Sequence, residues 1–429
     1  MDTPATRLGI EEATLDNGLK VLAIERHSAP VASVWAWYRV GSRNERLGIT
    51  GASHWVEHML FKGGREFGKG EIFKQVAKHG GVNNGFTHYD FTAYFETLPA
   101  AAMDLGLRIE ADRMAHAVFD PAEVASERTV IISEREGAEN HPSYLLSEEL
   151  NAAAFREHPY RWSVIGYKDD LRTMTRENLY AYYKLYYAPN NALLVVAGHF
   201  DRAALLARVA ELYGAIPRGA EPPPLAIREP EQRTERTVTL RQSGGAALVR
   251  VAFRVPEATH PDIDPLTVAA TVLSGASGLG MGGGVGGRTS RLHTALVRRE
   301  LASNAHAYCQ SSTDPHLFGA GATVREGVDI ARVEAALLAE LRRLHDEPPA
   351  DEEMEKARNQ IHASFAYAWD SVTGIGGLVG SAEATEGWRR LETFLERIDA
   401  VTAADVQRVA ARYFAEPNRT IGRFIPKAV

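Results

Sequence analysis

Cysteine is almost absent from this chain, since Cys309 is the only one among 429 residues. A single cysteine excludes an intrachain disulfide and a zinc site made of cysteine thiolates, and it fits a reducing compartment. No apolar run reaches about 18 residues, so no membrane span is expected. Residues 1–22 contain no apolar stretch with a small-residue cleavage site. We see no secretory signal there and expect a cytoplasmic protein.

A basic charge excess is also lacking, because the formal net charge is −7. This balance gives no reason to expect nucleic-acid binding. The composition, with 45% hydrophobic and 24% charged residues, is ordinary for a globular protein. At this length the chain exceeds one typical core, so two or three domains are expected.

The most informative feature that is present is the run His54-Trp55-Val56-Glu57-His58. Thr50 or Ser53 is positioned to cap a helix through this run. On a helix, residues 54, 57 and 58 share one face, where two imidazoles can hold a metal ion beside a carboxylate. The pattern H-x-x-E-H is the inverzincin signature. It predicts metal ligands at His54 and His58, and water activation by Glu57.

A third ligand is expected from a second element. Glu127 and Glu134 lie seven residues apart in a predicted helix over 121–139, so they share a face. Either can bind the metal while the other lies behind it or at the mouth of the site. A lone histidine pair is commonly a surface feature and a lone helix glutamate is commonly solvated. The helix context together with the downstream glutamates favours a metal site.

The order of predicted elements indicates an α+β chain with two related halves. Both halves close with a helix, an aromatic pair, a Pro-Asn turn and a strand, over residues 174–197 and 401–425, at an offset of 227–228 positions. Chance similarity is the bland alternative, and duplication is favoured. We expect an N-terminal domain over 1–215, a proline-rich linker over 216–232 and a homologous C-terminal domain over 233–429.

On these residues the chain resembles the zinc peptidases of the pitrilysin and mitochondrial processing peptidase family. Residues 54–63 are similar to that family's HFLEHMLFKG, residues 80–87 to its GG-x-x-N-A-x-T, and residues 92–94 to its T-x-Y. Later landmarks match at 158–160, at Gly166 and at 187–191. The resemblance covers nearly the whole chain and is strongest from 14 to 200.

The resemblance implies two homologous α+β domains, each an antiparallel sheet with helices on one side, facing one another like a clam shell. It implies that His54, His58 and Glu134 bind Zn²⁺, that Glu57 is the general base, and that Glu127 supports the histidines. Peptide substrates, short or unfolded, would bind extended along a sheet edge, aligned by Asn83 and Asn84. From the residues alone, Asn83-Asn84-Gly85 is also a reasonable hairpin turn.

The chain departs from the family where single-chain members carry an Arg and a Tyr seven residues apart. Leu296 and Ser303 stand at those places, and Tyr308 matches only with a gap. We therefore expect a paralogous partner subunit that supplies the pair, or a homodimer in which Tyr308 acts in trans. The alternative function is a non-catalytic, core-like homologue.

A glycine-rich loop occupies residues 275–287. It mimics a phosphate-binding loop only weakly, because the lysine is missing and no buried strand leads into it. A substrate-contacting loop and a plain flexible connection are both compatible with this composition.

Overall fold

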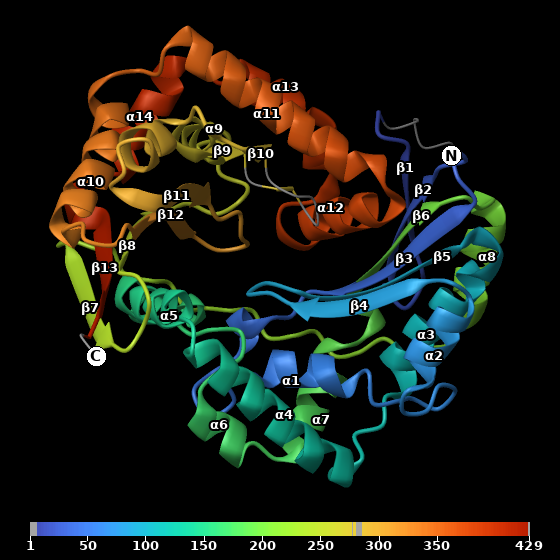
Figure 1. Cartoon of the computed structure of the whole chain (residues 1–429). Helices are drawn as coiled ribbons and strands as arrows, with labels where there is room; N and C mark the ends of the chain where they lie inside the picture. Colours follow the sequence, from blue (N-terminus) through green and yellow to red (C-terminus); the bar gives the residue numbers. More distant parts are fainter. Residues whose placement is uncertain (1–6, 277, 280–284, 428–429) are drawn as a thin grey trace. The chain divides into compact units, whose positions relative to one another are not determined.

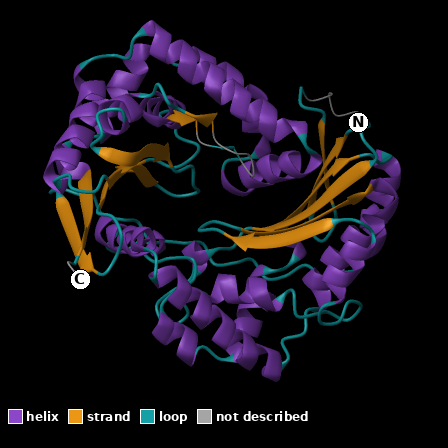
Figure 2. Cartoon of the chain, in the orientation of Figure 1, coloured by secondary structure: helices purple, strands orange, loops and turns teal. Residues whose placement is uncertain are grey.

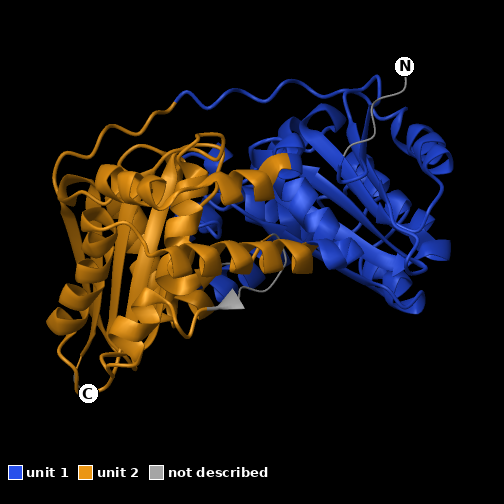
Figure 3. Cartoon of the chain, turned by 90° about the horizontal axis from the view of Figure 1, so that it is seen from above, with its two compact units in different colours: residues 1–135, 162–226, 369–392 blue, residues 136–161, 227–368, 393–429 orange. Residues whose placement is uncertain are grey.

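The computed structural model describes residues 7–276, 278–279 and 285–427. It divides into two compact units, neither continuous in sequence (Figure 3). Unit 1 comprises residues 1–135, 162–226 and 369–392, and unit 2 comprises 136–161, 227–368 and 393–429. Each unit therefore contains one segment from the other half of the chain, an exchange that the sequence patterns gave no sign of. Each unit is built on one main sheet with helices, which confirms the two-domain α+β class (Figure 2).

The sheet of unit 1 has six strands, antiparallel except for the parallel neighbours β2 and β6. In order across the sheet they are β1 (Ile10–Thr14), β2 (Lys20–Glu25), β6 (Ala192–Gly198), β3 (Val31–Tyr38), β5 (Thr92–Pro99) and β4 (Val82–Thr87). Val34, Ala36 and Tyr38 of β3 are fully buried in the main core of this unit. Because side chains alternate along a strand, Trp35 and Trp37 face the other side.

The helices of unit 1 gather mainly on the Tyr38 side of the sheet (Figure 1). They are α1 (Ala52–Met59), α2 (Glu71–Lys78), α3 (Met103–His116), α4 (Pro121–Glu139), α6 (Lys168–Thr173), α7 (Arg176–Tyr186) and α8 (Arg202–Tyr213). Helix α4 begins in unit 1 and ends in unit 2. This layer holds α1, which carries the H-x-x-E-H run, between α7 and the strands β4 and β5.

The opposite face of this sheet is covered by α12 (Val372–Thr385), which comes from the C-terminal half of the sequence. The helix approaches closely because it has glycines where it crosses the tryptophans. A Cβ at Gly376 would lie 2.2 Å from the Trp35 ring, and one at Gly380 would lie 2.1 Å from the Trp37 ring. At the end of the helix, Glu383 forms ion pairs with Lys20 and Arg39. Small residues and two ion pairs thus fix α12 on the sheet.

The sheet of unit 2 repeats this plan with five strands and one parallel pair, β13 with β7. In order they are β11 (Ala302–Cys309), β12 (His316–Val324), β8 (Leu248–Val255), β13 (Arg419–Pro426) and β7 (Arg236–Gln242). The helices of the C-terminal half are α9 (Ile263–Ser274), α10 (Ile330–Asp346), α11 (Asp351–Asp370), α13 (Phe394–Ala400) and α14 (Ala403–Tyr413). The exchanged helix α5 (Pro142–Ala154) packs Leu146 and Leu150 against Gly422 of β13.

Equivalent hydrogen bonds close both halves of the chain. Thr175 and Thr402 each form a capping box at the start of α7 and α14. After each helix an asparagine Nδ2 donates to the carbonyl of a tyrosine in that helix at 2.8 Å, Asn191 to Tyr186 and Asn418 to Tyr413. The match holds at the level of single hydrogen bonds, which supports the internal repeat.

The glycine-rich loop falls partly outside the described residues, namely at 277 and 280–284. Its described ends pair as a short two-stranded sheet, β9 (Gly275–Ala276) with β10 (Val285–Gly286). Among the described residues, no helix is both long and apolar enough to cross a membrane.

Candidate metal centre

The residue just before helix α1, Gly51, occupies a position that only glycine fits. Gly51 has φ of +88°, and a Cβ there would lie 2.2 Å from the Ile165 carbonyl oxygen. The expected caps Thr50 and Ser53 were wrong, because the carboxylate of Glu45 accepts hydrogen bonds from the backbone N–H groups of Gly51 and Ser53, both at 2.8 Å. Burial raises the pKa of Glu45 to about 8. The carboxyl group of Glu45, from the segment before α1, therefore anchors the start of the helix that carries the H-x-x-E-H run.

The other end of α1 is held by a buried arginine. Arg113 of α3 donates from Nε to the Leu60 carbonyl at 3.3 Å, just beyond the last turn of α1. Its guanidinium pairs with Glu110 and with Glu96, and lies 4.3 Å from the centroid of the Tyr94 ring. All three charged side chains are fully buried. Burial raises the pKa of Glu96 well above its usual range. Sequence patterns gave no signal for this buried cluster around Arg113, since its members come from three separate segments of the chain.

The predicted ligands converge in space. His54 Nε2 and His58 Nε2 are 3.3 Å apart. The Glu134 carboxylate lies 3.8 Å from His54 Nε2 and 3.5 Å from His58 Nε2. These three are the one group of three possible metal ligands, within 4.8 Å of one another, among the described histidine, cysteine and acidic residues. The Glu134 side chain is 46% exposed, so the group opens to solvent on its side.

Glu127 lies behind His58. His58 Nδ1 lies 2.8 Å from Glu127 Oε1, and Lys62 Nζ lies 2.5 Å from Glu127 Oε2. Although burial acts in the opposite direction, the hydrogen bonds from Lys62 and His58 lower the pKa of Glu127. Lys62 is a residue that the site analysis from sequence missed. It lies four residues after His58 and beyond the end of α1 at Met59, so helical spacing gave no signal for this contact.

Glu57 is buried beside this group and has one hydrogen-bond partner from β4. Thr87 Oγ1 donates to Glu57 Oε2 at 3.0 Å. Burial raises the pKa of Glu57, with His58 and Thr87 acting against the shift. Thr87 belongs to the segment 80–87, but its sequence spacing did not indicate a contact with Glu57.

Asn83 and Asn84 lie inside β4, so the hairpin-turn alternative for them does not hold. In the sheet of unit 1, β4 is an end strand, paired only with β5 among the described residues. Asn83 Nδ2 is buried without a hydrogen-bond partner in the described part of the chain, whereas Asn84 is exposed. A sheet edge with an unsatisfied amide donor is thus joined, through the Thr87 hydroxyl, to Glu57 on the helix that carries His54 and His58.

The donor set fits zinc. Ligand atoms at about 2.0–2.2 Å from a tetrahedral ion lie about 3.3–3.6 Å from one another, close to the separations of 3.3–3.8 Å found here. Burial, with a smaller effect of His58, lowers the pKa of His54 to about 3, which keeps that imidazole neutral as a metal ligand must be. His54 Nδ1 is buried without a partner among the described residues, unlike His58 Nδ1. Two imidazoles and one carboxylate leave a fourth position for water.

The structure describes the residues that stand where Arg and Tyr were expected, and also Tyr308. Leu296 is fully buried in the core of unit 2. Ser303 lies at an irregularity in the pairing of β11 with β12, and its hydroxyl is 3.5 Å from the Thr323 carbonyl. Tyr308 lies on β11 opposite Gly319. Burial raises the pKa of Tyr308, with Arg250 acting against the shift.

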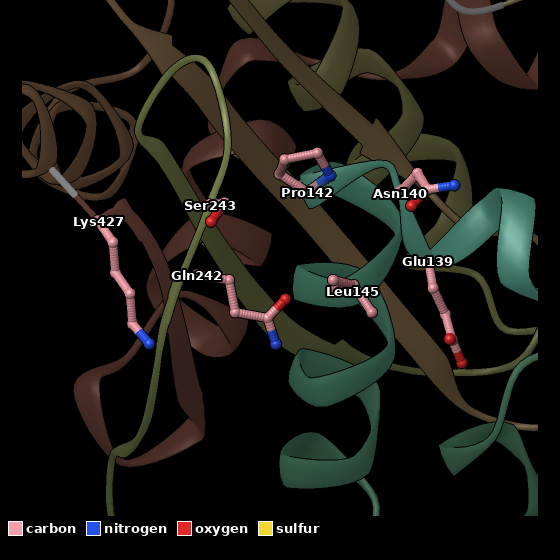
Figure 4. Close-up of a pocket in the computed structure, with 7 residues that line it drawn as sticks. All are labelled: Glu139, Asn140, Pro142, Leu145, Gln242, Ser243 and Lys427. Carbon is pink, nitrogen blue, oxygen red and sulfur yellow. The ribbon is translucent and has the colours of Figure 1, made fainter. Parts of the chain in front are cut away.

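Unit 2 also contains a pocket of about 380 Å³, which shares no residue with the metal-ligand group (Figure 4). It is lined by Glu139, Asn140, Pro142, Leu145, Gln242, Ser243 and Lys427. The lining is mainly polar and contains no histidine. We assign no role to this pocket.

A metal-ligand group of this kind, on a two-domain α+β chain, defines a class of zinc-peptidase-like proteins. Residues 20–168 match the family described as "Insulinase (Peptidase family M16)", and residues 173–361 match "Peptidase M16 inactive domain". The chain belongs to peptidase family M16. The resemblance read from the sequence is thereby confirmed.

Similar proteins fall in the same family. The chain is 29% identical over 417 residues to "Zinc protease PqqE" of Helicobacter pylori, covering 96% of this chain and 91% of that protein. It is 28% identical to a "Probable mitochondrial-processing peptidase subunit beta" of Arabidopsis thaliana, over 99% of this chain and 79% of that protein. A crystal structure of a protease from Helicobacter pylori superposes with a TM-score of 0.91 at 27% identity, over 97% of this chain and 99% of that one.

Proposed function

We propose that this chain is a zinc-dependent endopeptidase that cleaves short or unfolded peptides, and that it is the zinc subunit of a two-subunit enzyme. The observation that carries the proposal is the convergence of His54, His58 and Glu134 beside the buried Glu57. The names of two relatives, a zinc protease and a probable processing-peptidase subunit, agree with it.

His54 Nε2, His58 Nε2 and a Glu134 carboxylate oxygen would hold the ion. Bound Zn²⁺ supplies Lewis acidity, which lowers the pKa of water from about 15.7 to about 7 and polarises a substrate carbonyl. Glu57 then takes the proton from the attacking water and passes it to the leaving amine nitrogen. Its raised pKa suits this double task, because a carboxyl group with a pKa nearer neutrality both accepts and returns a proton. The Thr87 hydroxyl holds Oε2 and leaves Oε1 for the proton.

The peptide would bind as an added strand along the free edge of β4. Main-chain hydrogen bonds give such binding its affinity, and they suit extended, unfolded segments. Asn83 Nδ2, which has no partner in the described part of the chain, would donate to a peptide carbonyl and set its register. Asn84 lies exposed in the same strand and would border the peptide.

At positions 296 and 303, where single-chain family members carry an Arg and a Tyr, this chain supplies no group that could stabilise the oxyanion. Leu296 is buried and Ser303 is too short for the task of a tyrosine. A paralogous partner subunit would bring the Arg and Tyr. The second possibility is a homodimer in which Tyr308 acts in trans. Hydrogen-bond donors of this kind contribute about 10²–10³-fold to kcat.

Glu57→Gln tests the chemistry. We expect peptide cleavage to fall by about 10²–10⁴-fold while one zinc per chain remains bound. Glu136→Gln, an exposed change on α4, is the matched control and should leave cleavage unchanged. Retention of cleavage in the Glu57→Gln protein would refute the proposed base. Full activity from a demonstrably monomeric sample would refute the need for a partner.

A non-catalytic homologue is the second candidate, favoured by Leu296 and Ser303 and by the match of residues 173–361 to the M16 inactive domain. Metal analysis separates the two. Binding of one zinc that is lost in His58→Ala supports the enzyme, whereas absence of zinc after reconstitution supports the non-catalytic role.

A further inference from the structure

A second pair of histidines has nearly the geometry of the catalytic pair. His27 Nδ1 and His199 Nδ1 are 3.3 Å apart, the separation also found between His54 Nε2 and His58 Nε2. The ring centroids are 4.9 Å apart at an interplanar angle of 86°, compared with 4.6 Å and 70° for the catalytic pair. Both His27 and His199 are exposed, and neither lies in the H-x-x-E-H site.

The separation of the two nitrogens suits joint binding of one ion. At 3.3 Å one imidazole can donate to the other when it carries a proton at Nδ1, and the same distance fits two ligands of one metal ion. Two nitrogens bound at about 2.0–2.1 Å to a tetrahedral ion lie about 3.3–3.4 Å apart. We infer that His27 and His199 form a second, surface site for a divalent transition-metal ion of the zinc, copper or nickel type.

The backbone holds the two histidines in this position. They follow the parallel strands β2 and β6, whose last residues, Glu25 and Gly198, pair in register. Arg26 N–H donates to the Gly198 carbonyl at 2.7 Å, and His199 N–H donates to the Val31 carbonyl at 2.9 Å. The backbone on both sides of the pair is therefore fixed before any ion binds.

Gly198 allows the end of β6 to pass close to the backbone of Val31. Its φ is +141°, and a Cβ there would lie 2.3 Å from the Val31 carbonyl oxygen. Only glycine fits this turn without strain. The turn sets the direction in which the chain continues to His199, so the pairing of the two imidazoles is built into the end of the sheet.

The nearby carboxylates serve another purpose, so the site has two protein ligands. Glu25 Oε1 accepts the Arg202 N–H and Asp201 Oδ1 accepts the Ala204 N–H, both at the start of α8. No third possible ligand joins the pair among the described residues. Water fills the other positions. Imidazole ligands select zinc, copper and nickel over calcium and magnesium, which prefer oxygen.

A calorimetric titration of the metal-free full chain with zinc tests the site. We expect the unchanged protein to bind one equivalent of zinc tightly and a second equivalent more weakly. His27→Ala and His199→Ala should each remove the weaker equivalent and keep the tight one. His79→Ala is the matched control, because His79 is exposed and its Nδ1 is hydrogen-bonded to the Gln75 carbonyl of its own helix, and it should change neither.

This inference does not depend on the proposed function, and the variant His58→Ala tests the two separately. His58→Ala should remove the tightly bound equivalent of zinc and keep the weaker one. Electron paramagnetic resonance of that variant with Cu²⁺ should show two coordinated imidazole nitrogens, lost in His58→Ala/His199→Ala. A weaker equivalent that survives both His27→Ala and His199→Ala, or that His79→Ala also removes, would overturn the assignment.

Discussion

His58 Nδ1 lies 2.8 Å from the carboxylate of Glu127, and His58 Nε2 lies 3.3 Å from His54 Nε2. With the Nδ1–H donated to Glu127, the free lone pair of Nε2 faces the other ligands. This is how a carboxylate fixes the tautomer and the ring orientation of a metal-binding histidine. The arrangement makes Glu127 a positioning residue in the proposed site, one step removed from the ion.

Glu127→Gln should weaken zinc binding by about 10–100-fold without removing the ligands. The amide retains the shape of the carboxylate but loses its charge and its ion pair with Lys62. Zinc affinity measured by competition with a chelator is the readout, and cleavage at saturating zinc should largely recover. Glu136→Gln serves as the control on the same helix. An unchanged zinc affinity in Glu127→Gln would show that the hydrogen bond to His58 does not support the ligand.

Arg113→Met should lower the free energy of unfolding by about 3–5 kcal/mol, because it leaves the buried carboxyl groups of Glu96 and Glu110 without their cation. It also removes the hydrogen bond to the Leu60 carbonyl at the end of α1. Denaturant unfolding measures the loss. The matched change is Arg108→Met, on the same helix as Arg113. It breaks a half-exposed ion pair with Glu66, which precedes α2, and should cost at most about 1 kcal/mol. Equal costs for the two variants would contradict the role given to Arg113.

Gly380→Ala should destabilise the protein by about 1–3 kcal/mol, since the added methyl group overlaps the buried Trp37 ring. Trp37 stacks on Trp35 with ring centroids 5.3 Å apart, which leaves it little room to move. Gly137→Ala is the control, because nothing lies within 4 Å of a Cβ there and an exposed helical glycine gains about 0.5–1 kcal/mol from the change. Thermal unfolding of both variants checks the packing of α12. If Gly380→Ala is as stable as Gly137→Ala, the helix does not lie on the sheet in this way.

Asp262 offers a pH-dependent test of the core of unit 2. Although burial acts in the opposite direction, hydrogen bonds from Arg408 and Tyr413 lower its pKa in the folded state, and Arg412 also pairs with it. A lowered folded pKa gives stability that is present above the unfolded value of about 3.9 and is lost as the pH falls through the folded pKa.

Asp262→Asn should therefore cost about 1.5–3 kcal/mol at pH 7, and the difference from the unchanged protein should shrink below pH 4. Denaturant midpoints from pH 3 to 8 give the measurement. Asp370→Asn, at an exposed position, should show no such dependence. A cost that stays constant over this range would exclude the ionised pairs as its source.

Local patterns predicted much of this structure because the relevant interactions are local. The helix through 54–58 and the shared helical face of Glu127 and Glu134, seven residues apart, depend on neighbours within two turns. Long-range features had no such signal. Examples are the hydrogen bond from Arg113 to the Leu60 carbonyl and the exchange of α5 and α12 between the units. The expected antiparallel sheets each contain one parallel pair, because β6 and β13 return beside strands from the start of their halves.

The most direct test of the account is the position of zinc in a crystal of the chain purified with the metal, found from anomalous diffraction at the zinc absorption edge. We expect a peak about 2.0–2.2 Å from His54 Nε2, His58 Nε2 and a Glu134 carboxylate oxygen. A crystal grown with zinc that shows no peak between these three side chains, or shows Glu134 turned away from the imidazoles, would contradict it.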